Sequence, residues 1–358
     1  MDIFKNRLEK LKIIMKENGY NAFYVSNITN VRYLSGFTGS SGFLLITDEG
    51  DHFFSDGRYT EQSKHEIFDY KIHITNNHLK EINDKGLLNI KWHLCFEASH
   101  LSFNMYNTIE QQCQVSKLVP TNDIIECIAA VKDQSEIDAL QRAVDITDDV
   151  FDLIIPEIRA GVTEKQIAAR ISYLFKDQGG DGDSYDPIIA SGANGALPHA
   201  TPSDKKIENG DFIVMDFGAL YKGYHADMTR TVVVGSASDR HHEIYNIVLE
   251  SQLAGIDYAK SGIKCSELDK ACRDVIDDKG YGELFMHSTG HGLGLEVHTM
   301  PRIAWTNDTL LEENNVITIE PGIYIAGWGG VRIEDDCLIQ QNSCKPMNRS
   351  TKELVVVG

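Results

Sequence analysis

Two aspartates, Asp216 and Asp227, interrupt the apolar segments of a stretch near the middle of the chain, GDFIVMDFGALYKGYHADMTRTVVVG (residues 210–235). The stretch is typical of two strands joined by a tight turn, and a turn centred between Tyr221 and Lys222 would place Asp216 opposite Asp227. Side chains directly opposite each other in an antiparallel pair have Cβ atoms about 5 Å apart. Because two carboxylates at that distance repel each other, the pattern predicts a positive charge between them.

A second segment, ENNVITIEPGIYIAGWGGVRIEDDCLI, has the same design. Glu320 and Glu334 are symmetric about Gly327, so they too should face each other across a hairpin. An exposed sheet face can carry one such acidic pair, but two pairs on apolar strands are much less frequent. Lysine and arginine are missing from the facing positions, and buried acids in this number therefore need a cation.

A nearby histidine would distinguish a transition metal from magnesium or calcium, which prefer oxygen ligands. The segment HSTGHGLGLEVH supplies three histidines. Two have the spacing of the zinc helix HExxH, but the glutamate is absent and the glycines oppose a helix. The glycines do not lie in a βαβ unit, which disfavours a dinucleotide loop, and the triplet DFG lacks the other kinase motifs. The remaining candidate ligands are Asp216, Asp227, His291, Glu320 and Glu334.

Length and charge limit the classes of protein. The 358 residues, 42% hydrophobic and 24% charged, describe an ordinary globular chain with room for two domains. With 34 Lys and Arg against 53 Asp and Glu, the net charge of −19 disfavours nucleic acid and anionic membranes as partners. The first 19 residues resemble an amphipathic helix rather than a signal peptide or a membrane span. Seven cysteines without a CxxC pair favour a reducing compartment, so a cytoplasmic location is expected.

The elements that must position the acids fall into two groups. Residues 1–128 alternate short strands and helices, with a hairpin around Asp48-Glu49-Gly50, and this pattern predicts a small α/β domain. In residues 129–358, capping-box patterns at Ser135 and Thr163 predict helices ending near Ile155 and Gly179, and further helices are expected over about 242–260 and 266–278. Hairpins alternate with these helices without βαβ spacing, which indicates an α+β fold with a largely antiparallel sheet.

The order, spacing and neighbouring glycines of the five candidates resemble the pita-bread metallopeptidases, the creatinase/methionine aminopeptidase superfamily, or peptidase family M24. The resemblance covers about residues 130–358, and the preceding residues are similar to the creatinase-type N-terminal domain of the Xaa-Pro peptidase branch. It implies an α+β pita-bread catalytic domain preceded by a smaller α/β domain. The two hairpins would then lie in halves related by pseudo-twofold symmetry. All five ligand positions are filled, which disfavours creatinase-type members and non-catalytic binding members.

Four further residues, His199, His287, His298 and Arg332, match positions characteristic of aminopeptidase P and prolidase. Methionine aminopeptidases usually lack both a histidine four residues before the ligand histidine and a separate N-terminal domain of this size. The resemblance therefore implies an Xaa-Pro aminopeptidase, which hydrolyses the bond between an N-terminal residue and a following proline. An Xaa-Pro dipeptidase (prolidase) restricted to dipeptides is the alternative, followed by a methionine aminopeptidase or a binding member.

The resemblance also implies the roles of these residues. Two divalent ions would be bridged by Asp227 and Glu334, with Asp216 on one ion and His291 and Glu320 on the other. Mn(II) suits this mixed oxygen and nitrogen set, with Co(II), Zn(II) or Fe(II) as alternatives. A proline-containing peptide as substrate and a homodimer are further implications.

Among the remaining roles, Glu320 would also be the general base, His298 would stabilise the oxyanion, and His199 would fix the substrate. His287 and Arg332 would support the substrate pocket, and Tyr324 is expected to line it.

The accepted peptide length depends on what closes the far side of the pocket. A strict dipeptidase needs a cation against the free carboxylate of proline, and Arg332 is embedded in the ligand hairpin. The first domain offers Arg32, Arg58 and the small-residue loop GFTGSSG, without a bulky plug. An open site that also accepts Xaa-Pro-Yaa tripeptides and longer peptides is therefore expected.

Overall fold

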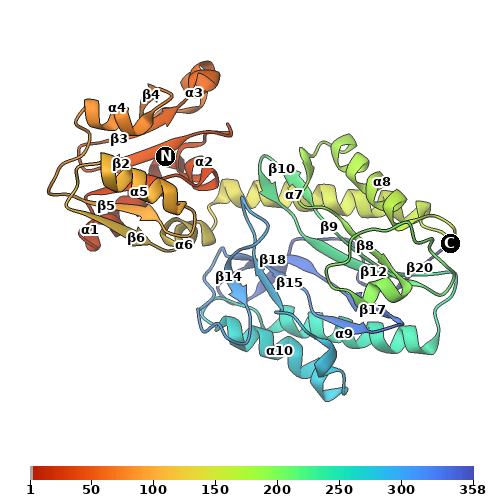
Figure 1. Cartoon of the computed structure of the whole chain (residues 1–358). Coiled ribbons are helices and arrows are strands. Elements are labelled where there is room, and N and C mark those ends of the chain that lie inside the picture. The colour runs from red at the N-terminus through yellow and green to blue at the C-terminus, as the bar shows by residue number, and fades with distance from the viewer. Residues whose placement is uncertain (1–2) are drawn as a thin grey trace. The chain divides into compact units, whose positions relative to one another are not determined.

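The computed structural model describes residues 3–358, and its internal contacts divide the chain into two compact units, Met1–Ala129 and Ala130–Gly358 (Figure 1). The first unit is a six-stranded mixed sheet flanked by helices, in the order β4-β3-β2-β1-β5-β6. Its strands are β1 (Ala22–Val25), β2 (Phe43–Thr47), β3 (Gly50–Ser55), β4 (Lys71–Ile74), β5 (His93–Glu97) and β6 (Lys117–Thr121). Its helices are α1 (Ile3–Glu17), α2 (Ile28–Ser35), α3 (Thr60–Glu66), α4 (His78–Asp84), α5 (Phe103–Gln112) and α6 (Ile124–Ala130). The predicted hairpin forms, with Thr47 paired to Gly50.

The second unit contains two larger sheets, in the orders β20-β12-β9-β8 and β14-β13-β15-β18-β19. The strands of the first are β8 (Ile188–Ser191), β9 (Phe212–Phe217), β12 (Met228–Val234) and β20 (Val355–Val357). Those of the second are β13 (Gly290–Gly292), β14 (Thr299–Ile303), β15 (Val316–Ile319), β18 (Asp335–Ile339) and β19 (Cys344–Pro346). Small ribbons complete the unit: β7 (Gly182–Asp183), β10 (Ala219–Tyr221), β11 (Tyr224–His225), β16 (Gly322–Ile325) and β17 (Gly329–Arg332). β20 runs parallel to β12, whereas the other strand pairs within residues 130–358 are antiparallel, as predicted.

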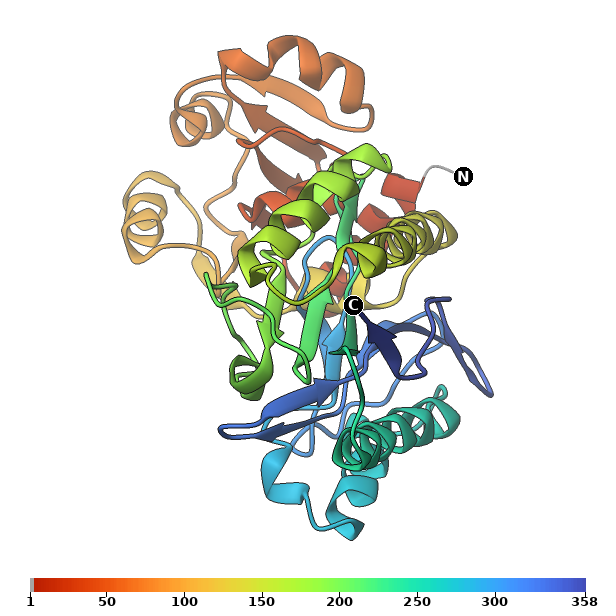
Figure 2. The same cartoon turned by 90° about the vertical axis from the view of Figure 1, so that its right-hand side faces the viewer.

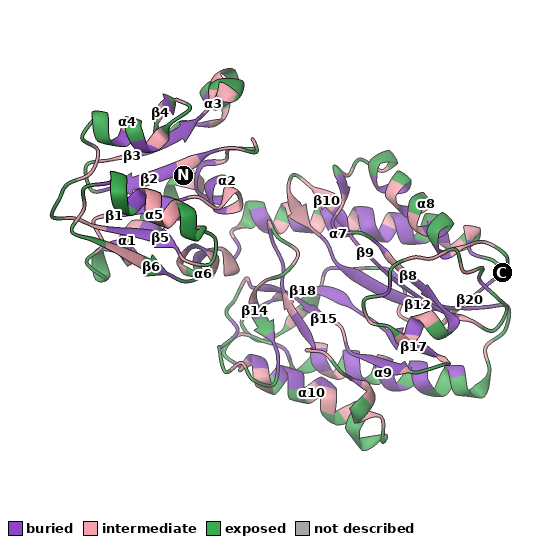
Figure 3. Ribbon diagram, viewed as in Figure 1, coloured by how far each residue is buried: buried purple, intermediate pink, exposed green. Residues whose placement is uncertain are grey.

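Four helices enclose these sheets: α7 (Gln134–Ile154), α8 (Glu164–Asp177), α9 (Asp239–Tyr258) and α10 (Cys265–Asp278). Figure 2 shows the strands between α7 and α8 (yellow to light green) and α9 and α10 (teal to cyan). Successive side chains of β12 point to opposite faces of its sheet, so the strand contributes to two hydrophobic cores. Val232 packs in the core with α7 and α8, and Val233 packs in the core with α9. β9 and β12 are accordingly buried throughout (Figure 3). No helix in residues 3–358 combines the length and the apolar character needed to cross a membrane.

The first helix of the second unit begins earlier than predicted. Its N-cap is Asp133, which forms a capping box with Glu136, rather than Ser135. Asp133, in extended conformation, accepts the hydrogen bond of the Glu136 amide, which is the role that the prediction gave to Ser135. The Ser135 hydroxyl donates to the Asp133 side chain instead. The predicted cap of α8 at Thr163 is confirmed.

The register of the first acidic hairpin differs from the prediction. Asp216 pairs with Thr229, so the expected direct pairing of Asp216 with Asp227 is wrong. The turn residues are Lys222 and Gly223, both with positive φ (49° and 77°), as in the two-residue turns that match strand twist. Centring the turn there moves the pairing by two residues, which preserves the alternation of side chains.

The second acidic hairpin has the predicted register, since Ile319 pairs with Asp335 and Gly322 pairs with Arg332. Glu320 and Glu334 lie opposite each other between these two pairs. Their amides bond outside the hairpin, to Thr289 O at 2.8 Å and Thr229 O at 3.1 Å, respectively. The two glutamates therefore tie this hairpin to the segment before β13 and to the first acidic hairpin.

Gly218 interrupts the first hairpin directly after β9. A Cβ atom at this position would lie 1.7 Å from the carbonyl oxygen of Ala226, so no side chain fits without moving the backbone. The glycine two residues after Asp216 therefore allows the two strands to approach just before Asp227.

Gly218→Ala should lower the free energy of unfolding by roughly 3 kcal/mol, because the clash is with backbone rather than with a flexible side chain. Gly182→Ala is the matched control: it lies in neighbouring β7, and its Cβ would meet only Lys176 Cε, at 3.8 Å. Urea unfolding of both variants measures the difference. Equal stability of the two variants would contradict the close approach at Gly218.

Candidate active site

A cavity of about 560 Å³ in the second unit brings the predicted residues together. All five candidate ligands line it: Asp216, Asp227, His291, Glu320 and Glu334. So do four of the predicted helpers: His199, His287, His298 and Arg332. These residues come from both acidic hairpins, β13 and the loops beside them, so the cavity exists only where the two sheets meet.

His291 lies among the acids. Its Nε2 is 3.6 Å from Asp227 Oδ2 and 3.5 Å from Glu320 Oε1. Asp227, His291 and Glu334 each offer one ligand atom, and these atoms lie within 4.8 Å of one another. This spacing is suitable for a shared metal ion.

The tautomer of His291 leaves Nε2 available as a ligand. Its Nδ1 lies 3.1 Å from Gly292 O, and a carbonyl only accepts hydrogen bonds, so Nδ1 carries the proton. Burial lowers the pKa of His291 to about 4, which keeps the ring neutral at pH 7. A neutral imidazole with its Nε2 lone pair toward carboxylates is the arrangement found in metal-binding histidines.

The carboxyl groups around His291 are held out of water. Burial, followed by the neighbouring carboxylates, raises the pKa of Asp227, Glu320 and Glu334 well above the ordinary values. Within residues 3–358, no lysine or arginine forms an ion pair with these three side chains. Without a metal, the cluster therefore retains protons.

Tyr185 lies between two of the acids and was missed by the sequence analysis. Its hydroxyl makes short hydrogen bonds to both Asp216 Oδ1 and Asp227 Oδ1. A hydroxyl has a single hydrogen to donate, so one of the two carboxyl groups must supply another. The two hydrogen bonds thus need one hydrogen more than the hydroxyl supplies. The segment SYDPIIASG, in which Tyr185 lies, carries no motif that predicts this position.

Arg332, Tyr324 and His287 form a chain of hydrogen bonds leading from Asp216. Arg332 Nη2 donates to Asp216 at 2.5 Å, and Nη1 donates to the Tyr324 hydroxyl at 2.8 Å. His287 Nδ1 must donate to Ser288 O, so its Nε2 accepts from Tyr324 at 2.9 Å. Burial lowers the pKa of His287 to about 3, which is consistent with this accepting role. Tyr324, expected to line the pocket, is instead buried and reaches the cavity through its partners.

The other two histidines lie at the exposed part of the cavity. His298 and His199 are both exposed, and the His298 ring centroid is 4.3 Å from that of His291. Glu320 Oε1, which lies near His291, also accepts a hydrogen bond from Thr318 Oγ1 at 3.3 Å. Two histidine side chains are thus accessible to a substrate beside the acidic cluster.

Comparison with known proteins matches both units. Residues 138–341 match the model of metallopeptidase family M24, and residues 7–129 match the Creatinase/Prolidase N-terminal domain. The chain belongs to metallopeptidase family M24. It is 39% identical to an Xaa-Pro dipeptidase of Pyrococcus horikoshii, over 99% of this chain and all of that protein.

Solved structures of M24 peptidases agree with this assignment. An Xaa-Pro dipeptidase from Bacillus anthracis has a TM-score of 0.95 at 39% identity, covering 99% of this chain and all of that one. An X-Pro aminopeptidase from Thermotoga maritima has a TM-score of 0.89 at 39% identity, covering 98% and 99% of the two chains. The predicted pita-bread fold with a creatinase-type N-terminal domain is confirmed.

The M24 family uses divalent metal ions, and the cavity fits that chemistry. Its donors are carboxylate oxygens and one imidazole nitrogen, and the Asp227, His291 and Glu334 ligand atoms are close enough to share an ion. The convergence of Asp216 and Asp227 on the Tyr185 hydroxyl gives the same indication, and within residues 3–358 no lysine or arginine forms an ion pair with Asp227, Glu320 or Glu334. A divalent ion would supply the positive charge that the described side chains do not.

Arg302 is a second residue of this M24 site that the sequence analysis missed. It lines the cavity and is exposed, and within residues 3–358 its guanidinium forms no ion pair. Arg332, the other cavity arginine, is occupied by Asp216. In HTMPRI, Arg302 follows His298 by four residues. This closeness in sequence to a predicted cavity histidine could have indicated that Arg302 lies in the site.

The raised carboxyl pKa values predict how metal affects stability with pH. In metal-free protein, the stability contributed by protonated Asp227, Glu320 and Glu334 is lost as pH rises through their raised pKa values. The buried histidines, whose pKa values are lowered, contribute no further change above about pH 7. Between about pH 7 and 8.5, Tm of the metal-free protein should therefore fall, and the rise in Tm on adding Mn²⁺ should increase. Scanning calorimetry at several pH values checks this, and a pH-independent Mn²⁺ effect would contradict it.

Proposed function

We propose that this M24 peptidase is a dinuclear-metal-dependent exopeptidase that hydrolyses the peptide bond between an N-terminal residue and a following proline. The observation that carries the proposal is the convergence of five ligand residues and two accessible histidines on one cavity. The Xaa-Pro dipeptidase of Pyrococcus horikoshii, similar over its whole length, supports the proline specificity.

Asp216, Asp227, His291, Glu320 and Glu334 are the proposed ligands of two divalent ions. Bound there, the ions would act as Lewis acids on the scissile carbonyl and activate a water as the nucleophile. The mixed oxygen and nitrogen donors favour Mn(II), with Co(II), Zn(II) or Fe(II) as alternatives.

The chain's own residues move the protons and hold the substrate. Glu320 takes the proton of the attacking water and passes it to the leaving amine, a role that its position in the cavity beside His291 supports. His298 donates a hydrogen bond to the developing oxyanion, and His199 fixes the substrate near the scissile bond. Arg332 holds Asp216 in place, and Tyr324 in turn holds His287.

Arg302 favours dipeptides among the possible substrates. The Arg302 guanidinium, which forms no ion pair within residues 3–358 and lies in a cavity lined by acids, is suited to the carboxylate at the end of an Xaa-Pro dipeptide. A longer peptide has no carboxylate at that position. The activity on longer peptides that the small-residue loop of the first unit predicts would then be slower than the activity on dipeptides. Similar proteins include both an Xaa-Pro dipeptidase and an X-Pro aminopeptidase.

The remaining proposals concern organisation. Domains of residues 1–128 and 129–358 are supported by the contact boundary after Ala129 and by the two family matches. Seven free cysteines support a reducing compartment such as the cytoplasm. The homodimer is carried over from the family resemblance.

Ligands and helpers should respond differently to substitution. Asp227→Ala and Glu334→Ala should lose Mn²⁺ and turnover together, because both remove ligand oxygens. His298→Ala should retain Mn²⁺ while kcat falls about 10²-fold, as for loss of one oxyanion donor. Metal analysis and Ala-Pro hydrolysis measure the two effects, with exposed His242→Ala as the control. A normal rate for His298→Ala would refute its role.

Arg302→Ala should lower kcat/KM for Ala-Pro by about 10- to 100-fold, mainly through KM, because it removes a charge-assisted hydrogen bond to the substrate. The rate for Ala-Pro-Ala should change little. Arg302→Lys, which keeps the charge, should recover part of the dipeptide activity. Equal losses on the two peptides would show that Arg302 does not recognise the free carboxylate.

A further inference from the structure

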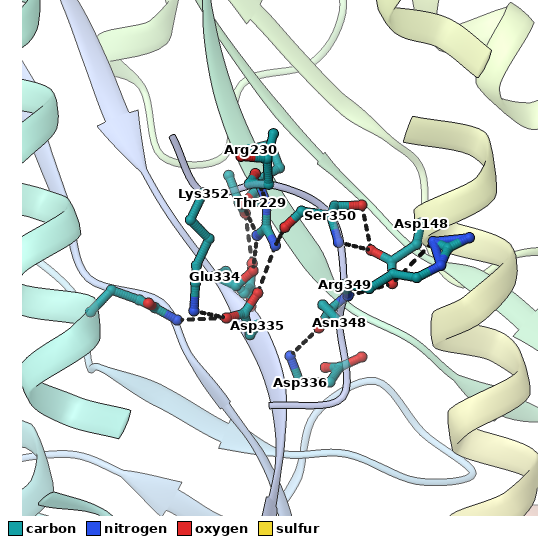
Figure 4. Close-up of polar contacts among 12 residues, drawn as sticks. Asp148, Thr229, Arg230, Glu334, Asp335, Asp336, Asn348, Arg349, Ser350 and Lys352 are labelled. Carbon is teal, nitrogen blue, oxygen red and sulfur yellow. Dashed lines mark hydrogen bonds and ion pairs between the residues drawn. The ribbon is translucent and has the colours of Figure 1, made fainter. Parts of the chain in front are cut away.

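A segment far along the chain, Asn348–Lys352, lies against the back of the two acidic hairpins (Figure 4). It follows β19 and precedes β20. Its backbone and side chains bond to buried groups of α7, β12 and β18, none of which lines the cavity. The segment therefore reaches the site through residues that lie behind the ligands.

Arg230 is the centre of these contacts. It is 1% exposed, and an arginine has five N–H donors in a fixed plane. Nη1 donates to Thr229 O and Glu334 O, and Nη2 donates to Asp335 Oδ1 and Ser350 O. Nε donates to Thr351 O at 3.0 Å. All five donors are used, so the guanidinium has one position in which every bond is made.

Three hydrogen bonds connect Thr229 and Arg230 to Glu334. Arg230 accounts for the bond to the Glu334 carbonyl, and Glu334 N donates to Thr229 O at 3.1 Å. The Thr229 hydroxyl donates to Glu334 Oε2 at 2.6 Å. Backbone and side chain of Glu334, which lines the cavity, are thus both fixed from the first acidic hairpin.

The 348–352 segment fixes Arg230 in turn. Two of its carbonyl groups accept hydrogen bonds from Arg230. The segment also places Lys352 Nζ 2.7 Å from Oδ2 of Asp335, the acid that pairs with Arg230. Gln252 of α9 donates to the same oxygen at 2.9 Å. Asp335 is 1% exposed, and a buried carboxylate with defined partners on both oxygens has little freedom to turn.

Buried Asp148 of α7 holds the segment at its other end. It accepts hydrogen bonds from the backbone amides of Arg349 and Ser350 and from the Ser350 hydroxyl. Because a buried carboxylate satisfied by backbone amides is costly to disturb, this anchor sets the position of the carbonyl groups that Arg230 uses.

We infer that Arg230 is a positioning residue for Glu334 and that the 348–352 segment, through Lys352 and Asp335, keeps Arg230 in place. The inference rests on the proposed function, in which Glu334 is a metal ligand. Partners of a ligand residue influence metal affinity because they orient it, and their loss lowers affinity by about 10- to 100-fold. A segment distant in sequence from every ligand except Glu334 would then contribute to metal binding.

Lys352→Met tests this without touching the cavity. It should weaken Mn²⁺ binding about tenfold in calorimetric titration, because Asp335 loses one cation and Arg230 is drawn toward it. Arg230→Lys, which keeps the charge but not the five donors, should weaken binding by 10- to 100-fold. Lys352→Arg should restore nearly wild-type affinity.

Lys205→Met is the matched control. Lys205 pairs with Asp211 at 2.7 Å, and its side chain is 29% exposed, against 23% for Lys352. It should bind Mn²⁺ as the wild type does, although it loses a comparable ion pair. Tm of each metal-free variant, measured in parallel, separates a loss of stability from a loss of affinity.

The outcomes distinguish the inference from the proposed function. If both Lys352→Met and Arg230→Lys bind Mn²⁺ with wild-type affinity, the inference is overturned and the proposed function is not affected. The same holds if Lys205→Met loses as much Mn²⁺ affinity as Lys352→Met. If Arg230→Lys does not fold, the affinity of Lys352→Met decides the question. A wild-type protein that binds no Mn²⁺ would overturn the metal site and the inference together.

Discussion

Several carboxylates that face one another away from water repel strongly, and the second unit is organised around that repulsion. Asp227 and Glu334 are buried, Glu320 beside them is half-buried, and in the described chain no lysine or arginine is paired to any of the three. Burial alone would leave them protonated, as their raised pKa values indicate. Only a cation allows all of them to ionise in place, so the same feature that destabilises the metal-free fold gives the folded chain its affinity for metal.

The surrounding structure keeps the acids close despite this repulsion. Gly218 lets the strands of the first hairpin approach, and the amides of Glu320 and Glu334 bond to neighbouring segments rather than within their own hairpin. Helices on both sides fix the sheets through separate cores that share β12. The ligand positions are thus set by backbone hydrogen bonds and packing, which do not depend on the charge state of the acids.

The sequence predicts the ligand set because its signals are local. Alternating apolar strands with acids symmetric about a turn gave the hairpin of Glu320 and Glu334 in its observed register. For Asp216 the turn was centred one position too early, since positive φ at Lys222 is not evident from a lysine. Tyr185 was missed because it reaches the cavity through long-range folding from a stretch without a motif, whereas Arg302 was missed although it follows the cavity residue His298 by only four positions.

The place of β20 in the central sheet has a consequence for synthesis. Residues 355–357 pair with β12, whose own residues are made long before them. While the intervening chain is being translated, β12 has an unpaired edge and Arg230 lacks the carbonyl groups of residues 350 and 351. The nascent protein can form its first unit early, because that unit is continuous in sequence. The second unit, by contrast, completes its central sheet and the bonds of Arg230 only after residues 350–357 have been made.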